Sequence, residues 1–281
     1  CVVSGRIVVA VLLSFAIAFP AFAEDASSFE VATYNIRFAN PGDGEDFWDH
    51  RSDAVIEYLQ RLDLFGLQEV TESQFATLRK GLADFDSYGV GRDDGKSGGE
   101  HAPIFYRRDR FESLDQGTFW LSQTPDVTGS KGWDAALPRT CTWIHLRDRR
   151  TDKTFVVGNT HFDHRGRQAR AESGRLIASK IDALPQNTPV ILLGDFNCKA
   201  ESEPYEALVA SVEDARQVSK KPPTGPDSTW SGFREIVPGQ IIDHVFVRAV
   251  DATSLSVDDP KTVAGRFASD HLPVRVVAEL K

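Results

Sequence analysis

Hydrophobic residues along the chain follow two spacings that distinguish strands from helices. Val190 to Leu193 is an unbroken run of four aliphatic residues, whereas a strand with one exposed face alternates apolar and polar positions. The run therefore predicts a strand that is buried on both faces. Between Trp48 and Leu62, in contrast, Val55, Ile56 and Leu59 recur at helical spacing, which predicts an amphipathic helix.

The same two spacings divide the rest of the chain. Further strands are predicted over Phe29 to Ile36, Leu64 to Gln68, Ala102 to Tyr106, Arg110 to Leu121, Arg139 to Leu146, Thr154 to Thr160, Ile241 to Val247, Thr253 to Val257 and Leu272 to Leu280. Further helices are predicted around Phe75 to Leu82, over Gly166 to Leu184 and over Pro204 to Ala215. This order predicts an α+β fold in which two β-sheets pack face to face with helices outside. It does not fit a doubly wound nucleotide-binding sheet, and the chain has no Gly-x-Gly-x-x-Gly or Walker sequence.

Residues 1 to 23 have the layout of a secretory signal peptide. Arg6 precedes an apolar stretch from Ile7 to Phe22, and Ala21-Phe22-Ala23 matches an A-x-A cleavage site. A membrane anchor is the alternative, but the stretch is short for a span of ~20 residues and has no basic stop-transfer flank. We therefore expect cleavage, a secreted or periplasmic protein without stable membrane insertion, and one domain over residues 24 to 281.

The chain is acidic. Its formal net charge is −9, which becomes −10 once Arg6 leaves with the signal peptide. Such a chain lacks the general electrostatic footprint of a nucleic-acid-binding protein, although a bound cation can invert the local field. Nucleic acid is therefore a disfavoured partner. Cys141 and Cys198 could pair in an exported protein, and their positions in the sequence leave this open.

Polar side chains stand at or just after the ends of six predicted strands. They are Asn35, Glu69, Asn159 with His161, Asp195 with Asn197, Asp243 with His244, and Ser269-Asp270-His271. Because side chains alternate along a strand, Asp195 and Asn197 are predicted to project from one face. A plain turn is also compatible with these two residues, since Asp and Asn both bond their own backbone. Six such endings in one chain favour a common site where the sheets open to solvent.

Six motifs contain these polar residues. In chain order they are Thr33-Tyr34-Asn35-Ile36-Arg37, Leu67-Gln68-Glu69-Val70, Asn159-Thr160-His161, Gly194-Asp195-Phe196-Asn197, Ile242-Asp243-His244-Val245-Phe246 and Ser269-Asp270-His271-Leu272-Pro273. Together they resemble the endonuclease/exonuclease/phosphatase superfamily, and residues 129 to 139 and 161 to 166 are similar to an exported bacterial branch of it. The resemblance covers residues 29 to 279 and implies a DNase I-like, four-layer α/β/β/α sandwich and a metal-dependent phosphoric ester hydrolase.

In-line cleavage of a phosphate ester requires neutralised phosphate oxygens, a deprotonated water and a protonated leaving oxygen. The resemblance implies that Glu69 is a metal ligand with Asn35 beside it, and that Asp270 is a second or shared ligand. Hard oxygen ligands suit Mg²⁺, which binds through one or two carboxylates and keeps several waters. Mg²⁺ is therefore the expected cofactor, with Mn²⁺ as the alternative.

The resemblance also assigns the residues that act on the phosphate. Asp195 is expected to orient or deprotonate the attacking water, and Asn197 to donate a hydrogen bond to a phosphoryl oxygen. His271 is expected to contact the phosphate while Asp243 fixes its ring. A carboxylate partner of this kind raises the pKa of the imidazole and favours its charged form.

A second histidine is expected to act in the reaction. His161 resembles the family's other histidine, which can stabilise the transition state or protonate the leaving group, and Glu100 matches the glutamate that pairs with it in the DNase I branch. Arg139, Tyr106 and Asn159 are expected to contact the substrate phosphate. A planar guanidinium suits such a contact.

One departure from the family pattern bears on the substrate. Thr71 stands where DNase I has an arginine two residues after its metal-ligating glutamate, which argues against DNase-like groove binding. We expect a monomeric phosphoesterase whose substrate is a small-molecule, sugar-linked or lipid-linked phosphodiester or phosphomonoester. A secreted nuclease is the alternative, and a non-catalytic binding or toxin-like module is the alternative of another class. Trp48, Trp120 and Trp133 are candidates either for the rim of a pocket or for loop packing.

Overall fold

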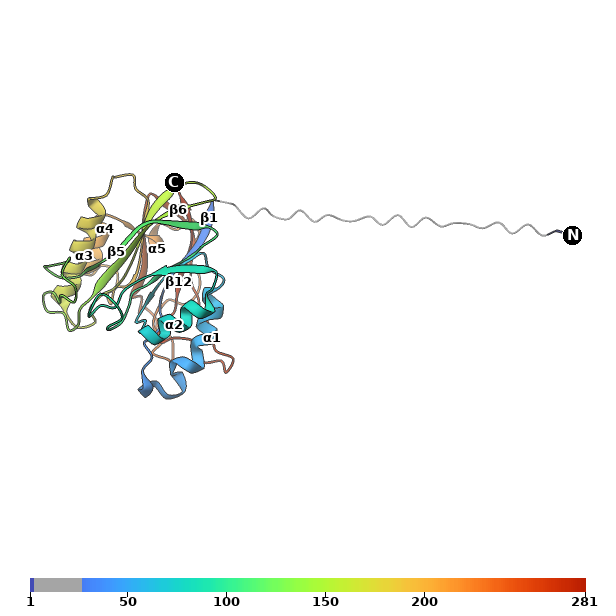
Figure 1. Ribbon diagram of the computed structural model, residues 1–281, viewed down its shortest axis with the longest axis horizontal. Coiled ribbons are helices and arrows are strands. Elements are labelled where there is room, and N and C mark those ends of the chain that lie inside the picture. Colours follow the sequence, from blue (N-terminus) through green and yellow to red (C-terminus); the bar gives the residue numbers. More distant parts are fainter. Residues whose placement is uncertain (3–26) are drawn as a thin grey trace.

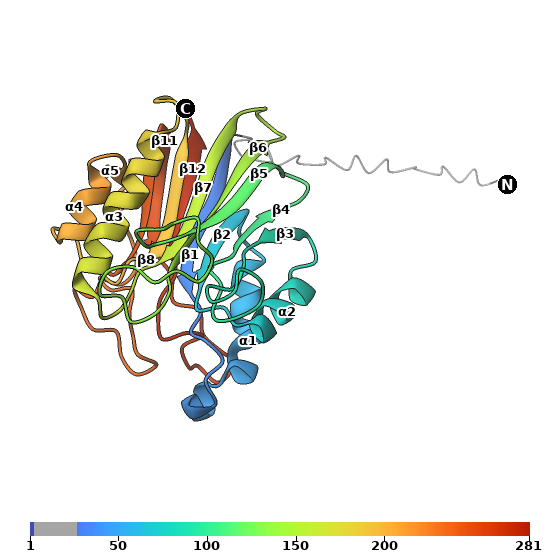
Figure 2. The ribbon, with the colours of Figure 1, turned by 60° about the vertical axis from the view of Figure 1, so that its left-hand side comes forward.

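The computed structural model describes residues 1–2 and 27–281. Two six-stranded sheets pack face to face, and helices cover the outer face of each, as Figures 1 and 2 show. The predicted α+β sandwich of four layers is therefore confirmed. The expected signal peptide lies outside the described residues apart from Cys1 and Val2. Within the described part of the chain, no helix has the length and apolar character needed to span a membrane.

The first sheet has the strand order β11-β12-β1-β2-β4-β3, in which β1 and β2 run parallel. Its strands are β1 (Ser28–Asn35), β2 (Leu64–Gln68), β3 (Phe85–Tyr88), β4 (Ile104–Arg107), β11 (Val250–Val257) and β12 (Val274–Leu280). The 3-10 helix η1 (Pro41–Asp46) and the helices α1 (Trp48–Leu59) and α2 (Glu72–Gly81) lie between its strands in sequence. Thr71 caps α2 by accepting a hydrogen bond from the backbone of Gln74, so this residue has a structural role.

The second sheet has the strand order β5-β6-β7-β8-β10-β9, in which β7 and β8 run parallel. Its strands are β5 (Phe111–Trp120), β6 (Thr140–Asp148), β7 (Thr154–His161), β8 (Val190–Asp195), β9 (Glu213–Asp214) and β10 (Asp243–Arg248). Its helices are α3 (Arg167–Asp182), α4 (Glu203–Val209) and α5 (Ala215–Val218). The prediction of one helix over Pro204 to Ala215 was wrong, because the chain leaves the helix after Val209 to add β9 to the sheet edge.

The core forms three hydrophobic layers that follow the alternation of side chains along the strands. On β8, Ile191 and Leu193 belong to the layer between the sheets, whereas Val190 and Leu192 pack in the layer that contains residues of α3 and α4. The aliphatic run is therefore buried on both faces, as its sequence predicts. The third layer lies between the first sheet and helices α1 and α2.

The layer between the sheets changes from apolar to polar at one end. On β1, the inward-facing residues Phe29 and Val31 are followed by Thr33 and Asn35. On β7, Phe155 and Val157 are followed by Asn159 and His161. On β8, Ile191 and Leu193 are followed by Asp195. All of the polar members are buried. The strand ends therefore deliver polar side chains to one end of the sandwich. Cys141 and Cys198 are buried free thiols and form no disulfide with each other.

Candidate active site

Strand register places the polar residues of the second sheet side by side. Asp195 at the end of β8 pairs with His161 on the parallel strand β7 and with Asp243 on the antiparallel strand β10. Directly paired residues on neighbouring strands point to the same face of a sheet. Asn35 of the first sheet completes the group, because its Nδ2 donates a hydrogen bond of 2.9 Å to Asp195 Oδ2. The two sheets therefore meet at Asp195.

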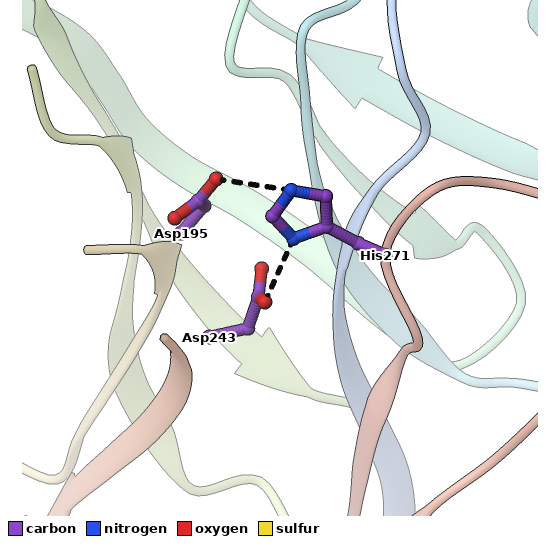
Figure 3. A group of neighbouring side chains, drawn as sticks. All are labelled: Asp195, Asp243 and His271. Carbon is purple, nitrogen blue, oxygen red and sulfur yellow. Dashed lines mark hydrogen bonds and ion pairs between the residues drawn. The ribbon is translucent and has the colours of Figure 1, made fainter. Parts of the chain in front are cut away.

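His271 lies between two aspartates, as Figure 3 shows. Its Nδ1 lies 2.9 Å from Asp243 Oδ2, and its Nε2 lies 3.8 Å from Asp195 Oδ2. Burial alone would lower the pKa of His271, but the two carboxylates outweigh it and raise this pKa well above its ordinary value. The imidazole is therefore an imidazolium at neutral pH, with the Asp243 partner that the sequence predicted.

Asp195 has the environment of a general base. Burial raises its pKa, the neighbouring Asp243 raises it further, and the resulting pKa is about 7 despite the opposing effect of His271. The backbone N–H of Asn197 donates to Asp195 Oδ1 at 2.9 Å. Asn197 has a positive φ of 46°, so the predicted alternation ends at Asp195, and Asn197 Nδ2 donates to Phe162 O at 3.1 Å. Asp195 and Asn197 therefore form a turn and also lie at the candidate site.

Asn35 orients two carboxylates. Its Nδ2 donates to Glu69 Oε1 at 3.1 Å as well as to Asp195, while its Oδ1 accepts the backbone N–H of Arg37 at 3.0 Å. The backbone donor fixes which end of the amide is the oxygen. The backbone uses one of the two lone pairs of this oxygen, so the expected role of Asn35 as a metal ligand stays a prediction.

Glu69 and Asp270 form the better candidate for a metal centre. Glu69 follows β2 with a positive φ of 61°, a conformation that costs about 1–2 kcal/mol for a residue other than glycine. Arg37 lies 4.0 Å from both carboxylates but donates two hydrogen bonds of 3.1 Å to Asp43, so three negative charges share one guanidinium. Burial raises the pKa of Asp270, and the charge of Glu69 raises it further. A divalent cation would relieve this repulsion, and carboxylate oxygens are the ligands that Mg²⁺ prefers.

A second group offers ligand atoms within 4.8 Å of one another, namely Asp195, Asp243 and His271. Here, however, the imidazolium of His271 already supplies the positive charge. A cation at this point would have to displace the proton on Nδ1 that bonds to Asp243. We therefore assign this group to proton transfer and phosphate binding.

The predicted pairing of Glu100 with His161 is not a direct hydrogen bond, since Glu100 Oε2 lies 3.9 Å from His161 Nδ1. Instead, Arg92 donates two hydrogen bonds to the Glu100 carboxylate, at 2.7 and 3.0 Å. His161 Nδ1 is bonded to Arg139 at 2.9 Å. The structure thus brings Arg139 into the site, as predicted, and adds Arg92, which the sequence did not indicate.

Two residues predicted to contact the phosphate lie elsewhere. Asn159 is fully buried, with Nδ2 bonded to Leu67 O and Pro103 O and Oδ1 bonded to Gln68. Its amide joins the two sheets and has no donor left for a phosphate. Tyr106 lies in the apolar layer between the sheets and pairs with Leu64 at the start of β2, away from the site.

The tryptophans are divided between packing and exposure. Trp48 and Trp120 are buried. Trp48 packs in the layer between the first sheet and helices α1 and α2, whereas Trp120 Nε1 donates to the backbone oxygen of Arg92 at 2.7 Å and so packs a loop. Trp133 is partly buried. Trp230, which the sequence did not single out, is 37% exposed and its backbone pairs with that of His271. It is thus an exposed aromatic side chain next to the site.

The two-sheet sandwich, with an acidic and histidine-containing site at the strand ends, defines the class of DNase I-like hydrolases. Residues 32–271 match the Endonuclease/Exonuclease/phosphatase family, and the chain belongs to this family. Its members hydrolyse phosphoesters and typically depend on a divalent metal.

Solved structures from Bacteroides are similar over nearly their whole length. An endonuclease/exonuclease/phosphatase from Bacteroides vulgatus is 40% identical with a TM-score of 0.86, and covers 90% of this chain and 99% of its own. A mannosyl-6-phosphatase from Bacteroides thetaiotaomicron is 38% identical with a TM-score of 0.84, and the match covers 89% of this chain and 99% of that one.

Curated relatives are more distant. Nocturnin from Drosophila melanogaster is 26% identical over 178 residues, which are 59% of this chain and 26% of that protein. Protein angel from the same species is 26% identical over 206 residues, which are 67% of this chain and 57% of that protein. The chain therefore spans at most a little over half the length of these relatives.

Proposed function

We propose that this protein is an exported, Mg²⁺-dependent phosphoesterase that hydrolyses the phosphomonoester of a sugar or of another small molecule. The observation that carries the proposal is the position of Asp195, a buried carboxylate with a pKa of about 7 that is flanked by two histidines. The net charge of −9 supports a small substrate over a nucleic acid. The similarity to a mannosyl-6-phosphatase supports a sugar phosphate.

In this proposal Asp195 accepts a proton from the attacking water. The water oxygen forms a bond to phosphorus as the ester P–O bond breaks, and the leaving oxygen takes up a proton to give the alcohol. His271 holds its charge between Asp243 and Asp195 and offers Nε2–H to the phosphoryl oxygens. Preorganised donors of this kind stabilise charge that develops in the transition state.

Glu69 and Asp270 would hold the metal ion, with Asn35 keeping Glu69 in place through its 3.1 Å hydrogen bond. When bound, a divalent cation would neutralise phosphate oxygens as a Lewis acid. The two carboxylates would then balance the charge of the cation, and Arg37 would stay paired with Asp43 at 3.1 Å.

A panel of phosphoesters tests the proposal. With Mg²⁺ present, we expect turnover of mannose 6-phosphate, glucose 6-phosphate or p-nitrophenyl phosphate, and a loss of about 10³-fold or more in kcat for Asp195→Ala. Asp126→Ala, at an exposed aspartate outside the residues assigned to the site, is the matched control and should retain activity. Inertness toward every monoester would overturn the proposal. Plasmid degradation abolished by Asp195→Ala would establish the nuclease alternative.

Export is tested separately. Expression of the chain with its first 23 residues in a bacterial host should release a protein from the cytoplasm whose amino-terminal residue is Glu24, after the A-x-A sequence. Intact protein retained in the membrane fraction would instead support the anchor.

A further inference from the structure

Arg139 connects two histidines at the edge of the site. Its NH1 lies 2.9 Å from His161 Nδ1, and its NH2 lies 3.0 Å from His164 Nδ1. Asp163 holds the same guanidinium through an ion pair of 3.5 Å between its Oδ2 and Arg139 Nε. Asp163 is itself fixed, because its Oδ1 accepts the backbone N–H groups of Arg165 and Gly166. Arg139 is thus held on one side while it faces His161 on the other.

A guanidinium can only donate hydrogen bonds, because it stays protonated in proteins and has no acceptor. The Nδ1 atom of His161 must therefore accept the hydrogen bond from Arg139, and the single proton of the neutral ring must lie on Nε2. His161 Nε2 points toward Asp195 Oδ2, at 3.5 Å. The bond to Arg139 consequently selects one tautomer of His161 and directs its N–H to the place where Asp195 would activate the water.

Charged groups surround His161, and the positive ones among them favour its neutral form. The groups of both signs come from every neighbouring element: Arg139 before β6, Arg92 and Glu100 between β3 and β4, Asp195 on β8, His271 before β12, and His164 after β7. Burial lowers the pKa of His161 well below its ordinary value, and Arg139 and Arg92 lower it further. Glu100 is a carboxylate that would raise the pKa from the Nδ1 side, but it is bound by both terminal nitrogens of Arg92 and its Oε2 lies 3.9 Å from Arg139 NH1.

We propose that His161 is a neutral hydrogen-bond donor to the phosphoryl group and not the acid that protonates the leaving group. Arg139 fixes its tautomer, and Arg92 is a positioning residue that keeps Glu100 from pairing with it. In the reaction proposed above, the leaving oxygen then takes its proton from solvent water, and the hydroxide so formed takes the proton from Asp195. The role of His161 as a donor to the phosphoryl group rests on the proposed function, whereas the assignment of its tautomer does not.

Leaving-group dependence separates the two roles. Glutamine keeps an N–H donor but cannot act as an acid, so His161→Gln should lower kcat/KM by a similar factor, within about threefold, for p-nitrophenyl phosphate and for an alkyl phosphate such as mannose 6-phosphate. His161→Ala should lose more activity than His161→Gln on both substrates. If His161 is the acid, the loss in His161→Gln should be about 100-fold larger for the alkyl ester, whose leaving group needs a proton. His145→Gln, on β6 of the same sheet, is the matched control.

Histidine ¹⁵N NMR tests the tautomer without any substrate. In the wild-type protein, with EDTA and again with Mg²⁺, the resonances that disappear in His161→Gln should report a neutral ring with the proton on Nε2 from about pH 5 to pH 8. In Arg92→Gln, Glu100 is released and His161 should begin to titrate in this range. Wild-type His161 that titrates near pH ~6.5, or that carries its proton on Nδ1, would overturn the inference.

The two arms fail independently of each other. If every phosphoester is inert, the proposed function fails, but the NMR result still decides the state of His161. If the enzyme is active and the NMR spectrum shows an imidazolium, the proposed function stands and this inference fails. Far-ultraviolet circular dichroism of each variant shows whether the comparison is made on folded protein.

Discussion

Because the carboxyl of Asp195 is buried, we expect its neutralisation to abolish activity and to stabilise the fold. Its pKa is raised from 3.8 to about 7, first by burial and then by Asp243. In the unfolded chain the carboxyl ionises near its ordinary pKa, so above about pH 7 the charge is present in both states and its burial destabilises the folded one. As the pH falls below about 7, the folded protein takes up a proton and the destabilisation disappears.

The size of this effect follows from the two pKa values. A difference between about 7 and 3.8, at about 1.4 kcal/mol per pKa unit, corresponds to roughly 4 kcal/mol. Asp195→Asn would not recover all of it, because Asn35 loses a carboxylate acceptor at 2.9 Å and His271 loses one of its two negative neighbours. We expect the variant to gain about 1–3 kcal/mol in the free energy of unfolding at about pH 8, and almost nothing near pH 4.

Urea unfolding of metal-free protein at these two pH values measures the effect, with Asp126→Asn as a control on an exposed aspartate. The wild-type enzyme should also lose kcat/KM as the pH falls through about 7, because the protonated carboxyl cannot accept a proton from water. If Asp195→Asn is as stable as the wild type at about pH 8, or less stable, the carboxylate is not destabilising and its role as a base with a raised pKa is refuted.

Three further substitutions test the parts around Asp195. Glu69→Gln should weaken Mg²⁺ binding by about tenfold or more in isothermal titration, because one of two carboxylate ligands loses its charge. Gly66→Ala should lower the free energy of unfolding by about 1–3 kcal/mol, since the new Cβ would lie 2.5 Å from the bonded side chain of Asn159. Arg51→Lys should lower the melting temperature and the Mg²⁺ affinity together, because Arg51 bonds the backbone oxygens of Arg37 and Ala268 on both sides of the candidate metal centre.

The fold was predictable because its strands follow simple rules of alternation. The aliphatic run at Val190 to Leu193 has apolar side chains on both faces, and both faces are buried. Polar residues at the end of a buried strand are expected to lie where the two sheets open to solvent. Asp195, Asp243 and His161 could therefore be placed together from the sequence. The short edge strand β3 (Phe85–Tyr88) was missed because its four residues give no repeat long enough to recognise.

The errors concern residues whose role depends on a contact across the sheets. Asn159 stands two residues before His161 and shares its face of β7, but it lies deeper and bonds the opposite sheet. Nothing in the local sequence distinguishes an amide that reaches the site from one that stops short of it. Arg92 lies in a glycine-rich loop where an arginine is ordinarily exposed, and its partner Glu100 is eight residues away in sequence. Only the folded loop shows that Arg92 binds the Glu100 carboxylate and so keeps it from pairing with His161.

The distribution of charge explains how an acidic chain can bind an anionic substrate. Around the candidate metal centre, the carboxylates of Glu69, Asp270, Asp195 and Asp243 outnumber the positive charges of Arg37 and His271, and Arg37 is also bonded to Asp43. This excess of negative charge favours a divalent cation. The His161 side is already balanced, because Arg92 and Arg139 match Glu100 and Asp163. A phosphate would therefore meet an uncompensated negative field without the cation and ready-made donors with it. We accordingly expect phosphate affinity, measured with inorganic phosphate, to depend on Mg²⁺ in the wild type and to require about tenfold more Mg²⁺, or still more, in Glu69→Gln.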